Sequence, residues 1–300
     1  MKNTIEQLNG FKDYLKSRII GQDSAIDHAV DAFENGALGL SDPDKPLASL
    51  LFLGPTGVGK TELTLQVGEF LFGKEKVFRF DMSEYMHEDA YSILIGSGKE
   101  DAGKLGNVLE SNFDGILLFD EIEKAHHKIF DLFLQMMGSA RISLANHKTY
   151  NLSKFFIVCT SNIGSDVLID VRSNSEVRME RAIFSRLFDF FRPELIGRFD
   201  KKIVFMPLST DSLRAIANFN IQKTLQRYLG KGYQLEVDSS AVEFLVRIGC
   251  NHRFGARPMK QAIIEYIANA VRSALREHSL ANGIISVSRD HSKLIVNPVF

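Results

Sequence analysis

A glycine-rich loop that ends in lysine and threonine carries the clearest chemistry in the sequence. It spans residues 54–61 and meets the spacing G-x-x-x-x-G-K-T at every position. Backbone N–H groups of such a loop converge on phosphate oxygens, while the lysine reaches the β- and γ-phosphates and the threonine hydroxyl faces Mg²⁺. An apolar run at residues 50–53 precedes the loop and a helical pattern follows it, so a chance glycine turn is a poor alternative. The loop predicts a nucleoside triphosphate site formed by Gly54, Pro55, Thr56, Gly57, Val58, Gly59, Lys60 and Thr61.

Two adjacent carboxylates, Asp120 and Glu121, follow a second apolar run at residues 115–119. In open α/β sheets ligands bind outside the carboxyl ends of the strands, so both side chains are expected beside the phosphates. Asp120 is predicted to hold Mg²⁺, directly or through water, and Glu121 to polarise the attacking water. The alternative is an acidic N-cap for the following helix, which the phosphate loop upstream disfavours.

Three further segments place polar or basic residues where they can reach the same site. Asn162 follows the predicted strand 155–160 and can contact the γ-phosphate or orient the water, although asparagine is also a common turn residue. Basic residues in segment 192–200 can complete a neighbouring subunit's site or form a weak surface ion pair. Arg257, before the last long helix, can approach the phosphates from a second domain or simply begin a helix at the surface.

The elements that position these residues alternate between strands and helices. This order predicts a mostly parallel sheet with helices on both faces, followed by a smaller, mostly helical domain. The predicted strands are 50–53, 77–81, 115–120, 155–160 and 201–205, with helices at 2–18, 24–38, 129–137 and 177–191 and a hairpin at 141–150. The second domain is predicted to contain helices 211–229, 239–248 and 256–277 and short strands 234–237, 284–287 and 293–296. We place the domain boundary between residues 207 and 208, giving domains 1–207 and 208–300.

The composition excludes several classes of protein. The 300 residues are 45% apolar and 24% charged, with a net charge of −1, which gives no global sign of a nucleic-acid or anionic-membrane partner. Two distant cysteines form no metal pattern and suit a reducing compartment. No stretch is long and apolar enough for a signal core or a bilayer span, so a cytoplasmic location is expected, with no membrane partner.

Several motifs occur in one order that resembles a known family. They lie at residues 20–23, 39–43, 51–63, 80–86, 118–126, 160–165, 191–194 and 254–258. Together they resemble the C-terminal ATPase module of the Clp unfoldase/disaggregase family of AAA+ ATPases, from about residue 12 to the end. The resemblance implies an AAA+ P-loop NTPase fold with a five-stranded sheet, a homo-oligomeric ring that is usually a hexamer, and hydrolysis of ATP with Mg²⁺ at subunit interfaces.

The same resemblance implies a role for each candidate residue. Lys60 and Thr61 become the Walker A residues, Asp120 and Glu121 the Walker B residues, Asn162 sensor 1, Arg198 the arginine finger and Arg257 sensor 2, while Ile19 and Ile20 line the adenine pocket. Glu121, Asn162, Arg198 and Arg257 are therefore the expected catalytic residues, and Thr61 and Asp120 the expected Mg²⁺ ligands.

The sequence departs from the family at the loop expected to grip substrate polypeptide. Family members carry a glycine–aromatic–valine–glycine loop there, but segment 94–105 is shorter, lacks an aromatic and contains Lys99, Glu100 and Asp101. An aromatic grips any sequence through apolar contact area, which a small charged loop does not offer. Tyr91 lies nearby and is a weak candidate substitute. No N-terminal substrate domain, first ATPase module, coiled-coil insertion or protease-docking tripeptide is expected, so a Clp-type protease is not an expected partner.

Three functions remain open on the sequence. The first is an ATP-hydrolysing ring that remodels a protein substrate or assembly, alone or through an adaptor. The second is an ATP-dependent assembly or switch module that recruits a partner and hydrolyses slowly, which the short loop favours. The third is a nucleic-acid motor or loader. Lys99, Lys104, Arg141 and Lys148 support it, and Glu100 and Asp101 oppose it.

Overall fold

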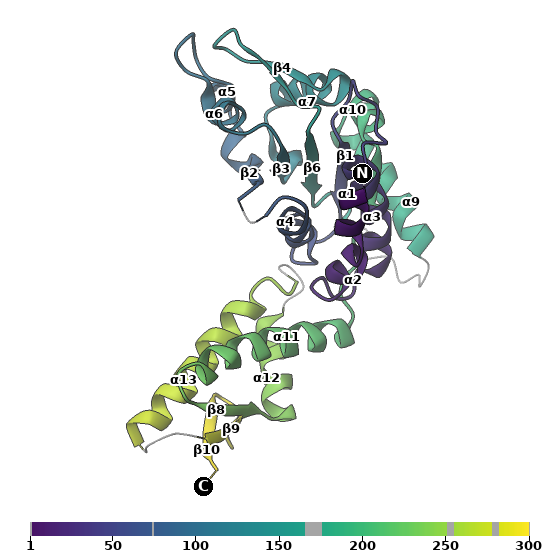
Figure 1. Ribbon diagram of the computed structural model, residues 1–300. Coiled ribbons are helices and arrows are strands. Elements are labelled where there is room, and N and C mark those ends of the chain that lie inside the picture. The colour runs from purple at the N-terminus through teal and green to yellow at the C-terminus, as the bar shows by residue number, and fades with distance from the viewer. Residues whose placement is uncertain (1, 74, 166–175, 251–254, 278–281, 300) are drawn as a thin grey trace. The chain divides into compact units, whose positions relative to one another are not determined.

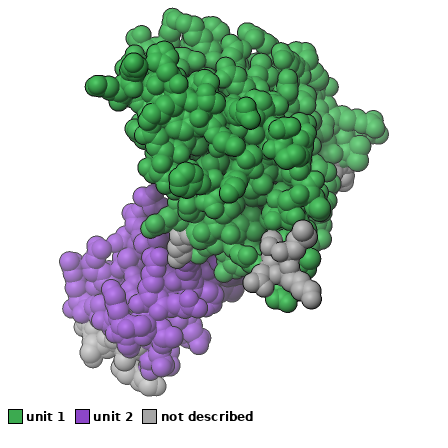
Figure 2. Space-filling view, turned by 45° about the horizontal axis from the view of Figure 1, so that its top comes forward, with its two compact units in different colours: residues 1–55, 59–206 green, residues 56–58, 207–300 purple. Residues whose placement is uncertain are grey.

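The computed structural model describes residues 2–73, 75–165, 176–250, 255–277 and 282–299 (Figure 1). The chain forms two compact units, one of residues 1–55 and 59–206 and the other of residues 56–58 and 207–300 (Figure 2). Each unit has a hydrophobic core of its own. No helix in the described part of the chain combines the length and the apolar character needed to cross a bilayer.

The first unit is built on a five-stranded sheet in the order β2-β3-β6-β1-β7. Every neighbouring pair is parallel, as the alternation of strands and helices predicts. The strands are β1 (Ala48–Leu53), β2 (Val77–Asp81), β3 (Gly115–Asp120), β6 (Phe155–Ser161) and β7 (Lys201–Val204). All residues of β1, β3 and β6 are buried because helices cover both faces, so the sheet consists of nearly unbroken apolar runs. The carboxyl ends of these strands meet at one edge, which is where the polar residues lie.

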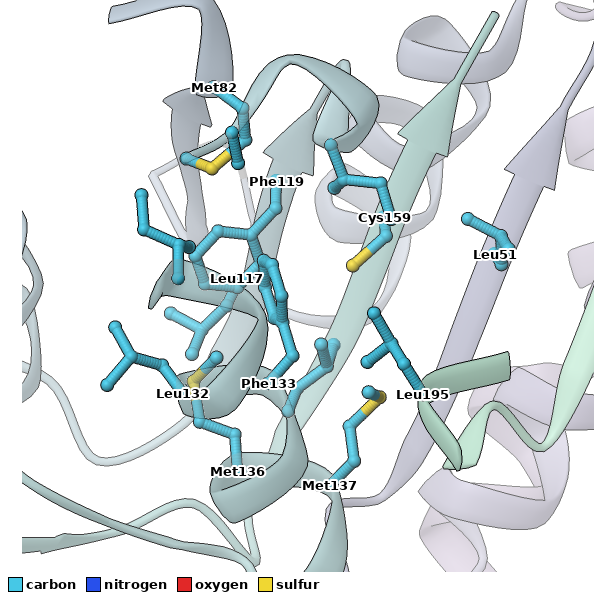
Figure 3. Close-up of a cluster of buried hydrophobic side chains, with 14 of the residues drawn as sticks. Leu51, Met82, Leu117, Phe119, Leu132, Phe133, Met136, Met137, Cys159 and Leu195 are labelled. Atoms are coloured by element: carbon cyan, nitrogen blue, oxygen red, sulfur yellow. The ribbon is translucent and has the colours of Figure 1, made fainter. Parts of the chain in front are cut away.

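Helices of the first unit lie on both sides of this sheet (Figure 1). The elements are α1 (Lys2–Leu8), α2 (Phe11–Lys16), α3 (Asp23–Ala37), α4 (Lys60–Leu71), η1 (Met82–Tyr85), α5 (Glu88–Ile95), α6 (Gly103–Ser111), η2 (Ile122–Lys124), α7 (His127–Ser139), β4 (Arg141–Ser143), β5 (Thr149–Asn151), α9 (Glu176–Phe190) and α10 (Pro193–Arg198). On one face Phe119 of β3 meets Phe133 of α7 edge to face, with ring centroids 4.9 Å apart (Figure 3). On the other face Phe156 of β6 packs against Phe33 of α3 at 5.0 Å. These contacts pack a helix against each face of the sheet.

The predicted single helix over residues 2–18 is wrong. The structure has two short helices, α1 and α2, separated at Asn9 and Gly10. Gly10 has φ 82°, a left-handed conformation that ends a helix and that glycine adopts without steric strain. The break directs Phe11 onto Phe70 of α4, with ring centroids 4.8 Å apart.

The second unit contains helices packed on a small sheet. Its elements are α11 (Thr210–Leu229), β8 (Gln234–Val237), α12 (Ser239–Gly249), α13 (Met259–Glu277), β9 (Asn282–Val287) and β10 (Leu294–Pro298). The strand order is β10-β9-β8, with β8 parallel and β10 antiparallel to β9. Ser209 and Asp238 cap α11 and α12 by accepting backbone N–H bonds. The predicted helix start at residue 256 is three residues early, since α13 begins at Met259; Phe254 of the motif at 254–258 lies outside the described residues.

Candidate active site

The glycine-rich loop connects β1 to α4 at the carboxyl edge of the sheet. A Cβ at Gly54, where φ is 131°, would lie 2.3 Å from the carbonyl oxygen of Phe205, so only glycine fits this position. Ile19 is buried and lies against the loop. The Cγ2 atom of Ile19 is 3.4 Å from the position that a Cβ on Gly59 would take. Ile20 is half-buried. The structure therefore brings Ile19 to the loop, as expected for a pocket wall.

Gln22 fixes the segment that carries these isoleucines. Its side-chain Nε2 donates to the carbonyl oxygen of Met206 at 2.8 Å, and its Oε1 accepts from the Met206 N–H at 3.1 Å. Gln22 is 3% exposed and was not predicted as a site residue. Its place in the segment 20–23 was the only sequence signal that could have identified it.

Lys60 is buried at the start of α4 with its ammonium directed at neutral oxygens. Nζ donates to the carbonyl oxygens of Gly54 and Pro55 at 2.6 and 2.7 Å and to Oδ1 of Asn162 at 3.0 Å. Burial lowers the pKa of Lys60 to about 8, and nearby carboxylates only partly oppose this. A buried cation whose hydrogen-bond acceptors are all neutral fits an anionic ligand such as a phosphate.

Thr61 and Asp120 present oxygen atoms side by side. The Thr61 hydroxyl lies 3.2 and 3.1 Å from the two carboxylate oxygens of Asp120. Asp120 is 5% exposed, and its Oδ1 also accepts a hydrogen bond from the hydroxyl of Thr160. Hydroxyl and carboxylate oxygens suit Mg²⁺, which is commonly held by one or two protein oxygens together with substrate phosphates. The described residues contain no cluster of three or more His, Cys, Asp or Glu that could bind a metal ion.

Glu121 is held in a left-handed conformation immediately after β3. Its φ is 58° and ψ 51°, values that an L-residue seldom adopts without local constraint. The backbone N–H of Glu121 donates to Thr160 Oγ1 at 3.1 Å, which pins this conformation. Its carboxylate accepts from Asn162 Nδ2 at 3.3 Å and pairs with Lys124.

Asn162 connects the lysine to the glutamate. Its amide oxygen accepts from Lys60 and its amide nitrogen donates to Glu121, so one side chain spans both groups. The backbone N–H of Asn162 donates to Oε1 of Glu123 at 3.1 Å. The other carboxylate oxygen of Glu123 is buried without a hydrogen-bond partner in the described part of the chain. Glu123 and Thr160 thus support the site, although neither was predicted.

Arg198 lies apart from this group. It is exposed at the end of α10, with Nη1 3.0 Å from the position a Cβ would take on Gly138 of α7. Asp200 accepts a hydrogen bond from the backbone N–H of Ser49 at 2.8 Å. Among the described residues, Arg198 forms no ion pair with Asp200 or Glu194, the two partners that the alternative of a surface ion pair required.

Arg257, the last of the predicted site residues, belongs to the second unit and is exposed there. Residues 56–58 of the loop are grouped with this unit, and Gly57 accepts from the backbone N–H of Ala256 at 3.3 Å.

The short charged loop between α5 and α6 is a closed turn. The Asp101 carboxylate accepts from Ser97 N, Ser97 Oγ and Gly103 N, each at 2.9 Å, and these bonds lower the pKa of Asp101. Lys99 and Glu100 are exposed at its tip. Tyr91 is half-buried and packs against the core of the first unit.

Two family models and several curated relatives match this chain. Residues 45–202 match the family described as "AAA domain (Cdc48 subfamily)", and residues 208–287 match the "C-terminal, D2-small domain, of ClpB protein". The chain is 34% identical over 301 residues to chaperone protein ClpB 1 of Thermosynechococcus vestitus, covering 97% of this chain and 35% of the relative. It is 36% identical over 305 residues to the chloroplastic chaperone protein ClpB2 of Oryza sativa, covering 97% and 30%. The chain thus spans about a third of the length of the curated relatives it matches.

Proposed function

Because this chain belongs to the AAA family and has a C-terminal small domain of the ClpB type, we propose that it is an ATP-hydrolysing ring protein that remodels protein substrates or assemblies. The observation that carries the proposal is the hydrogen-bonded group of Lys60, Thr61, Asp120, Glu121 and Asn162 at the strand ends, whose two halves are joined through the hydroxyl of Thr160. Each member has the chemistry that one part of phosphoryl transfer to water needs.

Each side chain has one task in this mechanism. The loop N–H groups and Lys60 bind the phosphates. Thr61 and Asp120 would hold Mg²⁺, which would neutralise phosphate charge. Glu121 takes a proton from the water that attacks the γ-phosphate, so ATP is cleaved to ADP and phosphate. Asn162 orients the carboxylate of Glu121 through the bond between Nδ2 and Oε1. Ile19 and Ile20 provide the apolar wall for adenine, and Gln22 holds that wall in place.

Two arginines complete the proposed site. Arg198 is exposed and separate from the cluster, as a residue that acts in a neighbouring copy must be. We assign it to the site of the next subunit of a homo-oligomeric ring, usually a hexamer in this family, where it stabilises the charge of the transition state. Arg257 is assigned to sensing the nucleotide from the second unit.

Mixing two inactive variants tests the shared site. Arg198→Ala and Glu121→Gln should each abolish ATP turnover, whereas their mixture should recover part of it. In mixed rings an intact Glu121 then lies beside an intact Arg198 from the neighbour. Arg192→Ala is the matched control, since Arg192 is another exposed arginine of this region and pairs with Asp131 at 3.3 Å; it should leave turnover near the wild-type rate. A mixture that never recovers activity would reject the assignment in trans.

The closed turn favours a second candidate, an ATP-dependent assembly or switch module that recruits a protein partner or adaptor. The turn is polar and held by hydrogen bonds to Asp101, so it offers no aromatic surface that could grip a polypeptide. The ring of Tyr91 packs against the core of the first unit. ATP-dependent unfolding of a tagged folded protein would support the remodeller. ATP-dependent oligomerisation of this chain without any unfolding would support the switch.

A further inference from the structure

Arg79 makes an ion pair that the proposed mechanism does not use. It lies on β2, the edge strand next to β3, and its guanidinium nitrogen is 2.7 Å from Oδ2 of Asp120. The Asp120 side chain is 7% exposed, whereas that of Arg79 is 44% exposed. A surface arginine therefore reaches in to a buried carboxylate that belongs to the nucleotide site.

The carboxylate of Asp120 is buried, so a nearby cation is required to stabilise its negative charge. An ionised carboxylate away from water is strongly disfavoured unless it is paired. Thr61 and Thr160 donate hydrogen bonds to Asp120 but carry no charge. Among the described residues, Arg79 is the basic residue that forms an ion pair with Asp120. Arg79 thus neutralises this carboxylate when no other cation is present.

Arg79 also has a second carboxylate within reach. Asp81 lies two residues further along β2, on the same face of the strand, and its Oδ2 is 3.9 Å from the same guanidinium nitrogen. Asp81 caps η1 by accepting from Ser83 N at 3.0 Å and Ser83 Oγ at 2.6 Å. Arg79 and Asp81 both line a pocket of about 630 Å³ between β2 and α6, which leaves room for the guanidinium to move.

We propose that Arg79 is a positioning residue that neutralises Asp120 in the nucleotide-free protein and is displaced toward Asp81 when Mg²⁺ binds with the nucleotide. The inference rests on the proposed function, because it takes Asp120 as a metal ligand. Two cations on one buried carboxylate repel each other, so Mg²⁺ and Arg79 compete for Asp120. The competition makes nucleotide affinity less dependent on Mg²⁺ than it would be without Arg79.

The test compares ADP binding with and without metal. A fluorescent ADP is titrated into the full chain in Mg²⁺ and in EDTA, and the ratio of Kd in EDTA to Kd in Mg²⁺ is the readout. Arg79→Gln should raise this ratio by about fivefold or more, the size of a typical coupling between sites. Arg79→Lys keeps the charge and should return the ratio toward the wild-type value. Lys104→Gln is the matched control: Lys104 lines the same pocket but pairs with Glu84 at 2.8 Å, so the ratio should not change.

A second variant keeps the proposal falsifiable if Arg79→Gln does not fold. Asp81→Asn removes the charge that receives Arg79, while the amide oxygen can still cap η1, so the ratio should fall below that of the wild type. An unchanged ratio in every folded variant would overturn the inference. If the wild-type chain binds ADP neither in Mg²⁺ nor in EDTA, that result would instead overturn the proposed nucleotide site.

Discussion

Lys60 is a buried cation of the site, and its pKa links the stability of the fold to pH. Its buried ammonium donates only to neutral oxygens, and burial lowers its pKa to about 8. Because this folded pKa lies below the value of 10.5 for an exposed lysine, the nucleotide-free fold gains stability as pH rises from about 8 toward 10.5. A bound phosphate favours the protonated form and so raises the pKa again.

This linkage predicts that nucleotide binding takes up protons in mildly alkaline solution. At about pH 8.5, calorimetry of ADP binding in buffers with different ionisation enthalpies should detect uptake of a fraction of a proton, and affinity should fall above about pH 8, by at most about tenfold per pH unit. Lys60→Arg is the control, because arginine stays charged in this range and should take up no proton. Binding by the wild-type chain with no proton exchange at this pH would contradict the assignment of Lys60.

The spacing of polar residues after apolar runs identified the members of the cluster but not the residues that hold them. Thr160 and Arg79 act through contacts with β3 from the neighbouring strands β6 and β2, and Glu123 of η2 contacts the backbone after β6. These contacts depend on the sheet order and register rather than on sequence distance. The register of β3 on β6, which pairs Phe119 with Cys159, places Thr160 beside Asp120. A correct prediction of that register would have identified Thr160 in advance.

At the scale of elements, Gly36 shows how closely α3 packs on the sheet. A Cβ there would lie 2.5 Å from Cε1 of Phe156 and 2.8 Å from the carbonyl oxygen of Leu47. Gly36→Ala should therefore destabilise the chain by about 1–3 kcal/mol through overpacking, measured by urea unfolding. Gly197→Ala on α10 is the control, since nothing lies within 4 Å of its Cβ position, and it should be neutral or stabilising by up to about 1 kcal/mol. Equal stability of Gly36→Ala and the wild type would show that α3 can shift away from β6.

Apolar runs predicted the strands of the main sheet closely, because central strands of a parallel sheet are buried on both faces. The turn between α5 and α6 could not be predicted in the same way. Its shape depends on hydrogen bonds from Ser97 and Gly103 to one carboxylate, Asp101, and local polar residues alone do not reveal such a pattern. The break at Gly10 was missed because helical periodicity continues across it.

At the scale of the whole molecule, the chain corresponds to about a third of each ClpB relative, and Lys60, Thr61, Asp120, Glu121 and Asn162 all lie in its first unit. We propose that these side chains hydrolyse ATP. A chain that bound the nucleotide without hydrolysing it would need Lys60 and Thr61 but no general base at Glu121.

The most direct test measures ATP binding and single-turnover hydrolysis in the same sample of Glu121→Gln. The account predicts that ATP with Mg²⁺ still binds with an affinity near that of the wild type, while hydrolysis slows by about 10²–10⁴-fold, the usual contribution of a general base. Glu110→Gln is the matched control, because Glu110 is exposed and pairs with Lys148 at 2.7 Å; it should hydrolyse at the wild-type rate. Hydrolysis by Glu121→Gln as fast as by the wild type would contradict the account.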